Sequence, residues 1–502
     1  ANYLPAVIEA AVEQIPLLVL TSDRPPELRD TGANQAINQT FLFGTHVRWF
    51  FDPGCPCSEF TTEALLSTID HAVSKTLQPL SGPVHLNFPF REPFFENAEK
   101  QTNSKVETIT AQKVYVRNTA FSKVLPDSEI KELLKNRPES GILSLGRVPA
   151  DSLVSLKKLA EELAWPVFAD VTSGLRLGEN CPNRITYYDQ LLIEDLDSVN
   201  WEIEAVWHIG FPPTSKRWLT HWGKNPATQM VWIADHAERH DQSHNFRWKI
   251  ECGIAEFCEQ LVSELKLAER AEVIPLKTQQ WLQASAKVEA VMEQHFPLNS
   301  EKKEIDDFAL SRRLTEIIPE THGFFIGNSI PVRAVDMLGS GKGAEIPAAL
   351  NRGASGIDGL IASACGYSSG LQRPVSLLIG DLSAMHDLNS FKLLADSPEP
   401  VFVVLLNNHG GGIFSFLPVA MQTDIFETFF GTPHSNDFLS VAEMFGLNYF
   451  RPNSISAFVK DYRQAVIQNK SAVIEIFTER DKNPQQLEAL AQKLMKCAFE
   501  SS

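Results

Sequence analysis

The sequence has no apolar run long enough to cross a membrane and no excess of positive charge. Its longest apolar runs, at residues 15–20 and 401–406, have the length of buried strands and fall far below the roughly 18 residues of a membrane helix. The 45 basic residues are outnumbered by 62 acidic residues, which gives a formal net charge of −17. Nucleic acids and anionic membranes bind positive surfaces, so we expect neither as a partner.

Paired cysteines are also scarce. The seven cysteines are an odd number, and only Cys55 and Cys57 lie close together in the sequence. We therefore expect free thiols in a reducing compartment. No second cysteine pair with metal-ligand spacing follows the Cys-Pro-Cys segment, so these two residues are better interpreted as loop cysteines than as a zinc site.

What the chain contains is typical of several globular α/β domains. Its 502 residues are enough for about three domains, and its 43% hydrophobic and 21% charged residues are close to globular averages. Short apolar runs alternate with amphipathic stretches in three groups, so we predict three doubly wound α/β domains with parallel sheets. The predicted domains span 1–100, 115–295 and 303–502, with a polar linker at 91–110. The expected strands lie at 17–20, 84–88, 142–146, 167–169, 205–209, 230–234, 324–327, 375–379, 401–406 and 472–477. The expected helices lie before Pro16, at 62–74, at 151–163 and within 254–293.

The strongest chemical signal is a pair of motifs that each follow a buried strand. Gly-Asp-Leu-Ser occupies residues 380–383, and Asn-Asn-His-Gly-Gly-Gly occupies residues 407–412. The carboxyl ends of parallel strands meet at one edge of a sheet, so both motifs point into one crevice. Asp381, Asn408 and the carbonyl of Gly410 offer the small number of oxygen ligands that Mg²⁺ takes when phosphate and water complete its shell.

Each motif alone is better explained by turn residues at a strand end. Their pairing, each after an apolar strand and spaced as a β-α-β crossover, favours a shared site. A helix that we expect to start near His386 would direct its N-terminus to the same phosphates.

Two further patterns are weaker. Gly-Tyr-Ser-Ser-Gly at 366–370 fits the nucleophile elbow of hydrolases, but that motif needs a strand before it, and residues 360–364 have a helical pattern. His236, His240 and His244 recur at helical spacing, but the glutamate of a His-Glu-x-x-His zinc motif is misplaced and the segment resembles a polar loop. We expect neither a hydrolase site nor a metal at these positions.

Together, the two strand-end motifs resemble the Gly-Asp…Asn-Asn signature of thiamine diphosphate enzymes, with Leu382 where Gly-Asp-Gly is usual. Four further segments narrow the resemblance to the family of 2-succinyl-5-enolpyruvyl-6-hydroxy-3-cyclohexene-1-carboxylate (SEPHCHC) synthases. It extends from residue 1 to about residue 477. The segments are Arg-Pro-Pro-Glu-Leu-Arg-Asp-Thr-Gly-Ala-Asn-Gln at 24–35, Gly-Asn-Ser at 327–329 with Arg333, Asn-Arg-Gly-Ala-Ser-Gly-Ile-Asp-Gly at 351–359, and Gly-Gly-Ile-Phe-Ser-Phe-Leu-Pro at 411–418.

The resemblance implies a transferase that decarboxylates 2-oxoglutarate and adds the resulting unit to isochorismate by 1,4-addition, in menaquinone or phylloquinone biosynthesis. It implies thiamine diphosphate and Mg²⁺ as cofactors, with Mn²⁺ as an alternative ion, and a homodimer or homotetramer. Free thiols and the absence of an export signal favour the bacterial cytoplasm, or the plastid stroma for a plant or algal source.

The resemblance also implies roles for individual residues. Ile357 would lie beneath the cofactor and enforce its bent shape, and arginines would pair with the substrate carboxylates. The residues implied at the reaction centre are Ile357, Gln35 and Ser329, and the implied metal ligands are Asp381, Asn408 and Gly410. The implied substrate-binding residues are Lys216, Arg217, Arg333, Arg352, Phe414 and Leu417. The implied cofactor-binding residues are Ser355, Ile357, Gly380, Asp381, Leu382, Ser383, Asn408, Gly410 and Ile413.

The family uses a glutamate that hydrogen-bonds the aminopyrimidine ring, in a segment before the position of Ala1. No residue here matches it, since Glu9 and Glu13 lie on the wrong helix. We therefore expect a family member truncated at its N-terminus, with the C-terminal part of a pyrimidine-binding domain, a central domain and a diphosphate-binding domain. The alternatives are an inactive cofactor-binding relative or fragment, and another thiamine diphosphate carboligase of the acetolactate synthase type.

Overall fold

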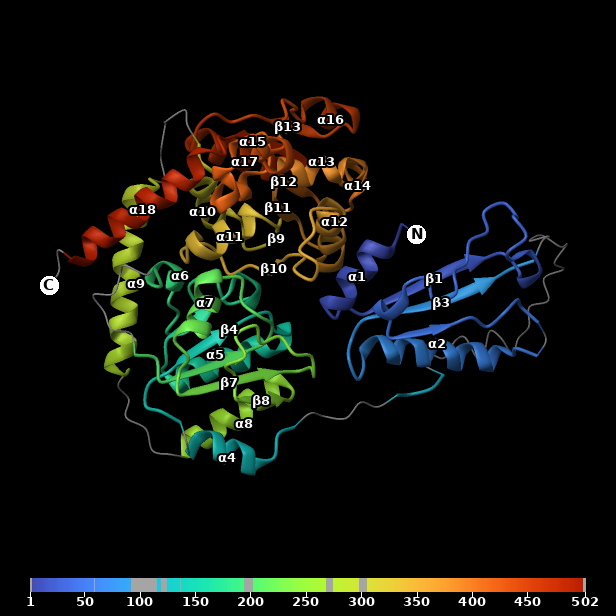
Figure 1. The fold of residues 1–502 in the computed structure, drawn as a ribbon, viewed down its shortest axis with the longest axis horizontal. Helices are drawn as coiled ribbons and strands as arrows, with labels where there is room; N and C mark the ends of the chain where they lie inside the picture. The colour runs from blue at the N-terminus through green and yellow to red at the C-terminus, as the bar shows by residue number, and fades with distance from the viewer. Residues whose placement is uncertain are drawn as a thin grey trace. The chain divides into compact units, whose positions relative to one another are not determined.

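The computed structural model describes residues 2–57, 59–91, 115–118, 124–135, 137–193, 202–267, 274–297 and 305–499 (Figure 1). The chain divides into two compact units, one of residues 1–122 with 351–356 and one of residues 123–350 with 357–502. Except for Arg91, the expected linker at 91–110 lies outside the described residues.

The smaller unit contains a parallel sheet with strand order β1-β3-β2. β3 is the central strand and is buried at six of its seven residues, as expected for a strand covered on both faces. At the start of α2, the Thr61 hydroxyl accepts a 3.2 Å hydrogen bond from the N–H of Ala64. The elements are α1 (Leu4–Val12), β1 (Leu17–Asp23), β2 (Trp49–Phe51), α2 (Thr62–Leu77) and β3 (Pro83–Pro89).

The first sheet of the larger unit has the order β5-β4-β6-β7-β8, and all of its strand pairs are parallel. Alternate residues of β4 point to opposite faces: Leu143 packs with α5 and α8, whereas Ile142 packs with α7 and α9. The elements of this layer are α4 (Asp127–Lys135), β4 (Ile142–Leu145), α5 (Leu153–Leu163), β5 (Val167–Ala169), α6 (Tyr188–Leu191), β6 (Ala205–Ile209), α7 (Lys216–Lys224), β7 (Gln229–Ala234), β8 (Trp248–Glu251), α8 (Ile254–Leu267) and α9 (Leu276–His295).

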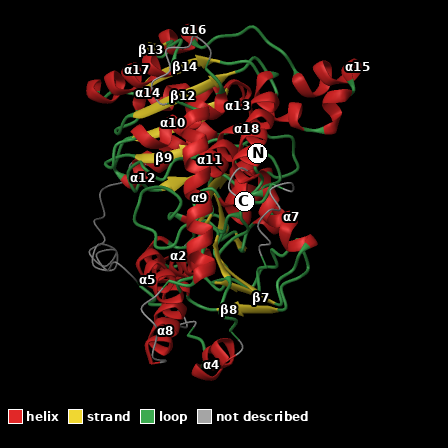
Figure 2. Ribbon diagram, turned by 90° about the vertical axis from the view of Figure 1, so that its left-hand side faces the viewer, coloured by secondary structure: helices red, strands yellow, loops and turns green. Residues whose placement is uncertain are grey.

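The second sheet of the larger unit has the order β10-β9-β11-β12-β14-β13 and is also parallel. Helices α10 and α17 cover one face and α12 and α14 cover the other. Figure 2 shows strands β14, β12 and β9 of this sheet one above another, with helices packed around them. The elements are α10 (Asp307–Ile317), β9 (Gly323–Ile326), α11 (Ile330–Leu338), β10 (Ala348–Ala349), α12 (Leu360–Leu371), β11 (Val375–Gly380), α13 (Asp381–His386), α14 (Phe391–Asp396), β12 (Val401–Asn407), α15 (Thr423–Phe426), α16 (Leu439–Met444), β13 (Asn448–Phe450), α17 (Ile455–Gln468), β14 (Ala472–Phe477) and α18 (Lys482–Phe499).

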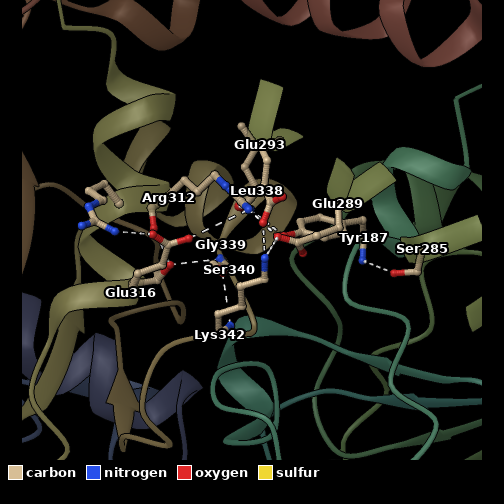
Figure 3. A network of polar contacts seen from close by, with 12 residues as sticks. Tyr187, Ser285, Glu289, Glu293, Arg312, Glu316, Leu338, Gly339, Ser340 and Lys342 are labelled. Atoms are coloured by element: carbon tan, nitrogen blue, oxygen red, sulfur yellow. Dashed lines mark hydrogen bonds and ion pairs between the residues drawn. The ribbon is translucent and has the colours of Figure 1, made fainter. Parts of the chain in front are cut away.

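A buried polar network joins the two layers of the larger unit (Figure 3). The guanidinium of Arg312, on α10, is 1% exposed and forms a 2.6 Å ion pair with Glu289 on α9. It also donates hydrogen bonds to the hydroxyl of Tyr187 and, at 3.0 Å, to the carbonyl of Leu338. Because a buried charge is costly unless it is paired, this network fixes how the layers pack.

The prediction of an α/β fold with parallel sheets is confirmed, and the ten expected strands correspond to strands of the structure. The segment 366–370, which resembles a nucleophile elbow, lies inside α12 rather than after a strand. The histidines of 236–244 lie in the connection between β7 and β8 and not on a helix. No helix in the described part of the chain is long and apolar enough to cross a membrane.

Candidate cofactor and metal site

Three adjacent strands of the second sheet end at the predicted site. Strands β9, β11 and β12 lie side by side in this parallel sheet. Ser329 follows β9, Asp381 follows β11, and Asn408 follows β12. The two motifs therefore lie at the same edge of the sheet, where ligands bind in doubly wound folds.

Asp381 is the buried side chain at the centre of this edge. Its Oδ2 accepts a 3.0 Å hydrogen bond from the N–H of Gly410, and its Oδ1 accepts one of 2.6 Å from the N–H of Leu382. Burial raises the pKa of Asp381, and these N–H groups together with His434 act in the opposite direction. A cation at this carboxylate would offset the cost of burying it.

The expectation of a helix starting near His386 is wrong, because α13 begins at Asp381 and ends at His386. Gly380 is the last residue of β11, so the chain passes from strand to helix without a loop. Leu382 is half-buried and Ser383 is buried in the first turn of α13, which places all four residues of the motif beside the strand end.

Asn408 offers an unused oxygen. Its Nδ2 donates a 3.2 Å hydrogen bond to Asp307, whereas its buried Oδ1 has no hydrogen-bond partner within the described residues. Gly410 has φ of +149°, and a Cβ there would lie 2.2 Å from the carbonyl oxygen of Gly431. A side chain at this position is excluded, so the backbone can approach an ion closely.

These donors fit a small, hard cation. One carboxylate and one unpaired amide oxygen lie beside a glycine backbone, and Mg²⁺ completes such a set with phosphate oxygens and water. A Cβ on Gly412 would lie 2.7 Å from Asn408 Nδ2, so this glycine also keeps the amide in place. Among the described residues, no group of three or more His, Cys, Asp or Glu side chains is arranged to hold a metal.

Two neighbours of the site carried no signal in the sequence. Asn436 N–H donates to Nδ1 of His434 at 3.2 Å, so Nε2 carries the proton and donates to Asp381 Oδ2, also at 3.2 Å. Asp307 is fully buried and accepts from Asn408. His434 and Asp307 are 53 and 101 residues from their partners, so local spacing could not reveal them.

Two of the predicted anion-binding groups lie at the starts of helices. Arg333, on α11, is exposed and donates a 2.8 Å hydrogen bond to the carbonyl of Ser329. Lys216 and Arg217 open α7, where Lys216 is exposed and Arg217 is paired with the buried carboxylate of Asp189. Asp189 was not predicted, and it holds one edge of the Arg217 guanidinium.

Arg217, on α7, also lies close to α11. Its Nη1 lies 4.0 Å from the Sδ of Met337, which is on α11 one turn after Arg333. The predicted cations on the two helices therefore lie on neighbouring elements of the larger unit.

The predicted apolar residues differ in exposure. Ile413 packs against the core that contains α7 and α9, and the Phe414 ring lies 5.6 Å from that of Phe430. Leu417 is 43% exposed, and Ile357 is half-buried.

Three predicted residues belong to the smaller unit. Gln35 lies in the loop after β1, and Arg352 and Ser355 lie in the segment 351–356. Ile357 is the first residue after this segment and belongs to the larger unit. The loop that contains Gln35 also borders a cleft of about 410 Å³ lined by Arg24, Asn34 and Phe90.

Glu9, which the sequence offered no reason to place at the site, holds the segment 351–356. Its two carboxylate oxygens accept hydrogen bonds from the N–H groups of Gly353 and Ala354, at 2.9 and 2.7 Å. Residues 351–356 also contain two predicted site residues, so Glu9 shapes the loop that presents them.

Positive backbone φ angles occur at several predicted site residues. Gln35, Ser329 and Ser355 have φ of +59°, +72° and +55°, and His409, between two predicted ligands, has +61°. Ser329 combines its φ with a ψ of −127°, outside the small left-handed region that non-glycine residues tolerate. Such strained residues cluster at binding and catalytic sites.

Comparison with known proteins gives the family. A profile described as "Middle domain of thiamine pyrophosphate" matches residues 106–326, and one described as "Thiamine pyrophosphate enzyme, C-terminal TPP binding domain" matches residues 345–476. A relative from Rubrobacter xylanophilus, named "2-succinyl-5-enolpyruvyl-6-hydroxy-3-cyclohexene-1-carboxylate synthase", is 39% identical over 487 residues, or 96% of this chain and 83% of the relative. The chain belongs to the SEPHCHC synthase family.

Relatives of the same name from Chlorobium phaeobacteroides and Salinibacter ruber are 38% and 37% identical. They match 96% and 97% of this chain, and the chain covers 82% of each of them. The predicted resemblance to SEPHCHC synthases is confirmed, and the chain is a member of an enzyme family with thiamine diphosphate-binding domains. The alternative of an acetolactate synthase-type protein is not favoured.

Proposed function

We propose that this protein is a SEPHCHC synthase that depends on thiamine diphosphate and Mg²⁺. It would decarboxylate 2-oxoglutarate and add the resulting four-carbon unit to isochorismate. The observation that carries this proposal is the geometry at the ends of β11 and β12. Asp381 accepts the Gly410 N–H at 3.0 Å, and the adjacent Asn408 keeps a buried oxygen without a partner in the described structure.

Asp381, Asn408 and the carbonyl of Gly410 would hold the metal, with Mn²⁺ as an alternative ion. When bound, thiamine diphosphate supplies the electron sink that decarboxylation needs. The chain's own residues bind and orient the cofactor: those proposed to line its site are Ser355, Ile357, Gly380, Leu382, Ser383 and Ile413.

Both substrates are dianions, so the site of this acidic protein needs focused cations. We assign the substrate carboxylates to Arg333, Arg352, Lys216 and Arg217, because a guanidinium pairs with a carboxylate through two parallel hydrogen bonds. The pairing of Arg217 with buried Asp189 leaves the rest of that guanidinium for a ligand, since its side chain is 37% exposed.

Further polar and apolar side chains have proposed roles of their own. Ser329 and Gln35 would hydrogen-bond the reacting groups, Phe414 and Leu417 would form apolar walls, and Ile357 would support the cofactor. The strained backbone at Ser329 and Gln35 supports these roles.

We further propose a homodimer or homotetramer in the cytoplasm. The domains would be the C-terminal part of a pyrimidine-binding domain at 1–100, a central domain at 115–295 and a diphosphate-binding domain at 303–502. Exposed apolar side chains on the larger unit support assembly, since Met421, Phe429 and Met444 are 77%, 69% and 79% exposed. Six described cysteines are free thiols, which supports a reducing compartment.

The test is a donor-competition assay on the full-length protein with thiamine diphosphate and Mg²⁺. Isochorismate is supplied with 2-oxoglutarate, with pyruvate, or with both, and products are identified by mass spectrometry. We expect SEPHCHC to form from 2-oxoglutarate and to persist in the mixture. Acetolactate from pyruvate would support the acetolactate synthase alternative, and a protein that binds the cofactor without turnover would support the inactive relative.

A further inference from the structure

A fully buried carboxylate lies behind the proposed metal ligand Asn408. Asp307 is the first residue of α10 and is 0% exposed. Its Oδ2 accepts hydrogen bonds from Nδ2 of Asn408 at 3.2 Å and from Nδ2 of Asn483 at 2.7 Å. Its Oδ1 accepts a 2.5 Å hydrogen bond from the hydroxyl of Thr478. Three donors from three segments of the chain therefore converge on one carboxylate.

This arrangement determines which end of the Asn408 amide faces the site. The terminal torsion of an asparagine is soft and roughly two-fold, so the amide alone does not distinguish its oxygen from its nitrogen. Both oxygens of Asp307 accept hydrogen bonds, Oδ1 from Thr478 and Oδ2 from Asn483, so the end of Asn408 that faces Oδ2 is its NH₂ group. The oxygen is then directed away from Asp307, and it is this oxygen that has no partner among the described residues.

Capping of α10 does not explain Asp307. The preceding residue, Asp306, is the cap: its carboxylate accepts hydrogen bonds from the N–H groups of Phe308 and Ala309 at 3.0 and 2.7 Å. A second acidic side chain is not needed there, and a buried carboxylate has a cost that must be offset by its partners.

We propose that Asp307 is a positioning residue that fixes the Asn408 amide with its oxygen toward the metal. The inference rests on the proposed Mg²⁺ and thiamine diphosphate function. Thr478 follows β14 and Asn483 lies on α18, so the orientation of the ligand is set by elements outside both sequence motifs.

The test measures the affinity of the full-length protein for thiamine diphosphate as Mg²⁺ is varied, by isothermal titration calorimetry. In Asp307→Asn, a single neutral carbonyl oxygen replaces the two carboxylate oxygens that accept from Asn408, Asn483 and Thr478, so the Asn408 amide is no longer held in one orientation. We expect the half-saturating Mg²⁺ concentration to rise about 10–100-fold, the usual effect of losing a group that orients a ligand. Saturating Mg²⁺ should restore cofactor affinity, which a general loss of structure would not allow.

Two further variants separate orientation from charge and folding. A carboxylate is by itself a better Mg²⁺ ligand than an amide, yet Asn408→Asp should weaken Mg²⁺ binding, because it faces Asp307 with a second carboxylate. The double variant Asp307→Asn with Asn408→Asp should recover most of the affinity, since the new amide can donate to the new carboxylate. The matched control Asp306→Asn retains a capping side chain and should bind Mg²⁺ as the wild type does.

If the wild-type protein binds the cofactor in a Mg²⁺-dependent way, two results would overturn the inference. They are an unchanged Mg²⁺ dependence in Asp307→Asn and tighter Mg²⁺ binding in Asn408→Asp. If Asp307→Asn does not fold by circular dichroism, the Asn408→Asp comparison decides. A wild-type protein whose cofactor binding ignores Mg²⁺ would instead overturn the proposed metal site, and the role of Asp307 with it.

Discussion

The buried His208 makes the stability of the larger unit depend on pH. It lies on β6, is 0% exposed, and donates from Nε2 to the carbonyl of Phe211 at 2.8 Å. Its Nδ1 accepts from the hydroxyl of Ser144 at 2.9 Å, and that hydroxyl accepts from the indole N–H of Trp218, also at 2.9 Å. The neutral imidazole, with its proton on Nε2 and an acceptor at Nδ1, satisfies this chain of hydrogen bonds, and burial lowers the pKa of His208 to about 3.

The sign and size of the effect follow from proton linkage. In the unfolded chain a histidine has a pKa of about 6.5, so between about pH 6.5 and pH 3 the unfolded state binds more protons at His208 than the folded state does. The stabilisation by neutral His208 is complete above pH 6.5 and is lost as the pH falls. At about 1.4 kcal/mol per pH unit, the free energy of unfolding drops by about 2 kcal/mol between pH 7 and pH 5.

Urea unfolding at pH 7, 6 and 5, followed by tryptophan fluorescence, measures this loss of unfolding free energy with fluorophores that lie beside His208. The Trp222 and Trp232 rings have their centroids 5.0 and 4.6 Å from that of His208. In His208→Gln the decrease from pH 7 to pH 5 should be smaller than in the wild type by about 2 kcal/mol. The matched control His386→Gln removes an exposed histidine and should keep the wild-type slope; equal slopes for wild type and His208→Gln would refute the reasoning.

Three further predictions concern the site. Asp381→Ala removes the one carboxylate among the proposed ligands and should abolish Mg²⁺-dependent cofactor binding in calorimetry; retained affinity would contradict the assignment. Arg352→Ala should lower kcat/KM for the dianionic substrates about 10–100-fold, because a charged hydrogen bond contributes roughly 1.5–3 kcal/mol. Cofactor affinity should stay nearly unchanged, and Arg373→Ala, at an exposed arginine, is the control. Glu9→Ala removes a charged hydrogen bond of the same strength and should speed amide exchange at Gly353 about tenfold or more. Unaltered protection of this amide in hydrogen–deuterium exchange would show that Glu9 does not hold the loop.

Long buried strands could be predicted because a parallel strand covered on both faces is a continuous apolar run. Strands β11 and β12 are of this kind, and every residue of β12 is buried. The strands without a prediction, β2, β8, β10 and β13, have two to four residues and lie at sheet edges. Their pairing depends on neighbouring strands, so no local apolar run marks them.

The site residues also fall into those that the local sequence predicts and those that it does not. Asp381 and Asn408 could be predicted because each follows a strand and the ends of adjacent parallel strands meet. Asp307, His434 and Asp189 could not, because each acts through a partner brought close only by folding. Such residues orient the groups that the motifs supply, and their chemistry is visible only in three dimensions.

A crystal structure of the full-length protein with thiamine diphosphate and Mn²⁺, with the metal located by its anomalous scattering, tests the central claim most directly. We predict one metal peak on the order of 2 Å from a carboxylate oxygen of Asp381, Oδ1 of Asn408 and the carbonyl oxygen of Gly410, with the diphosphate on its open side. A peak elsewhere, or a diphosphate bound away from the ends of β11 and β12, would contradict the account.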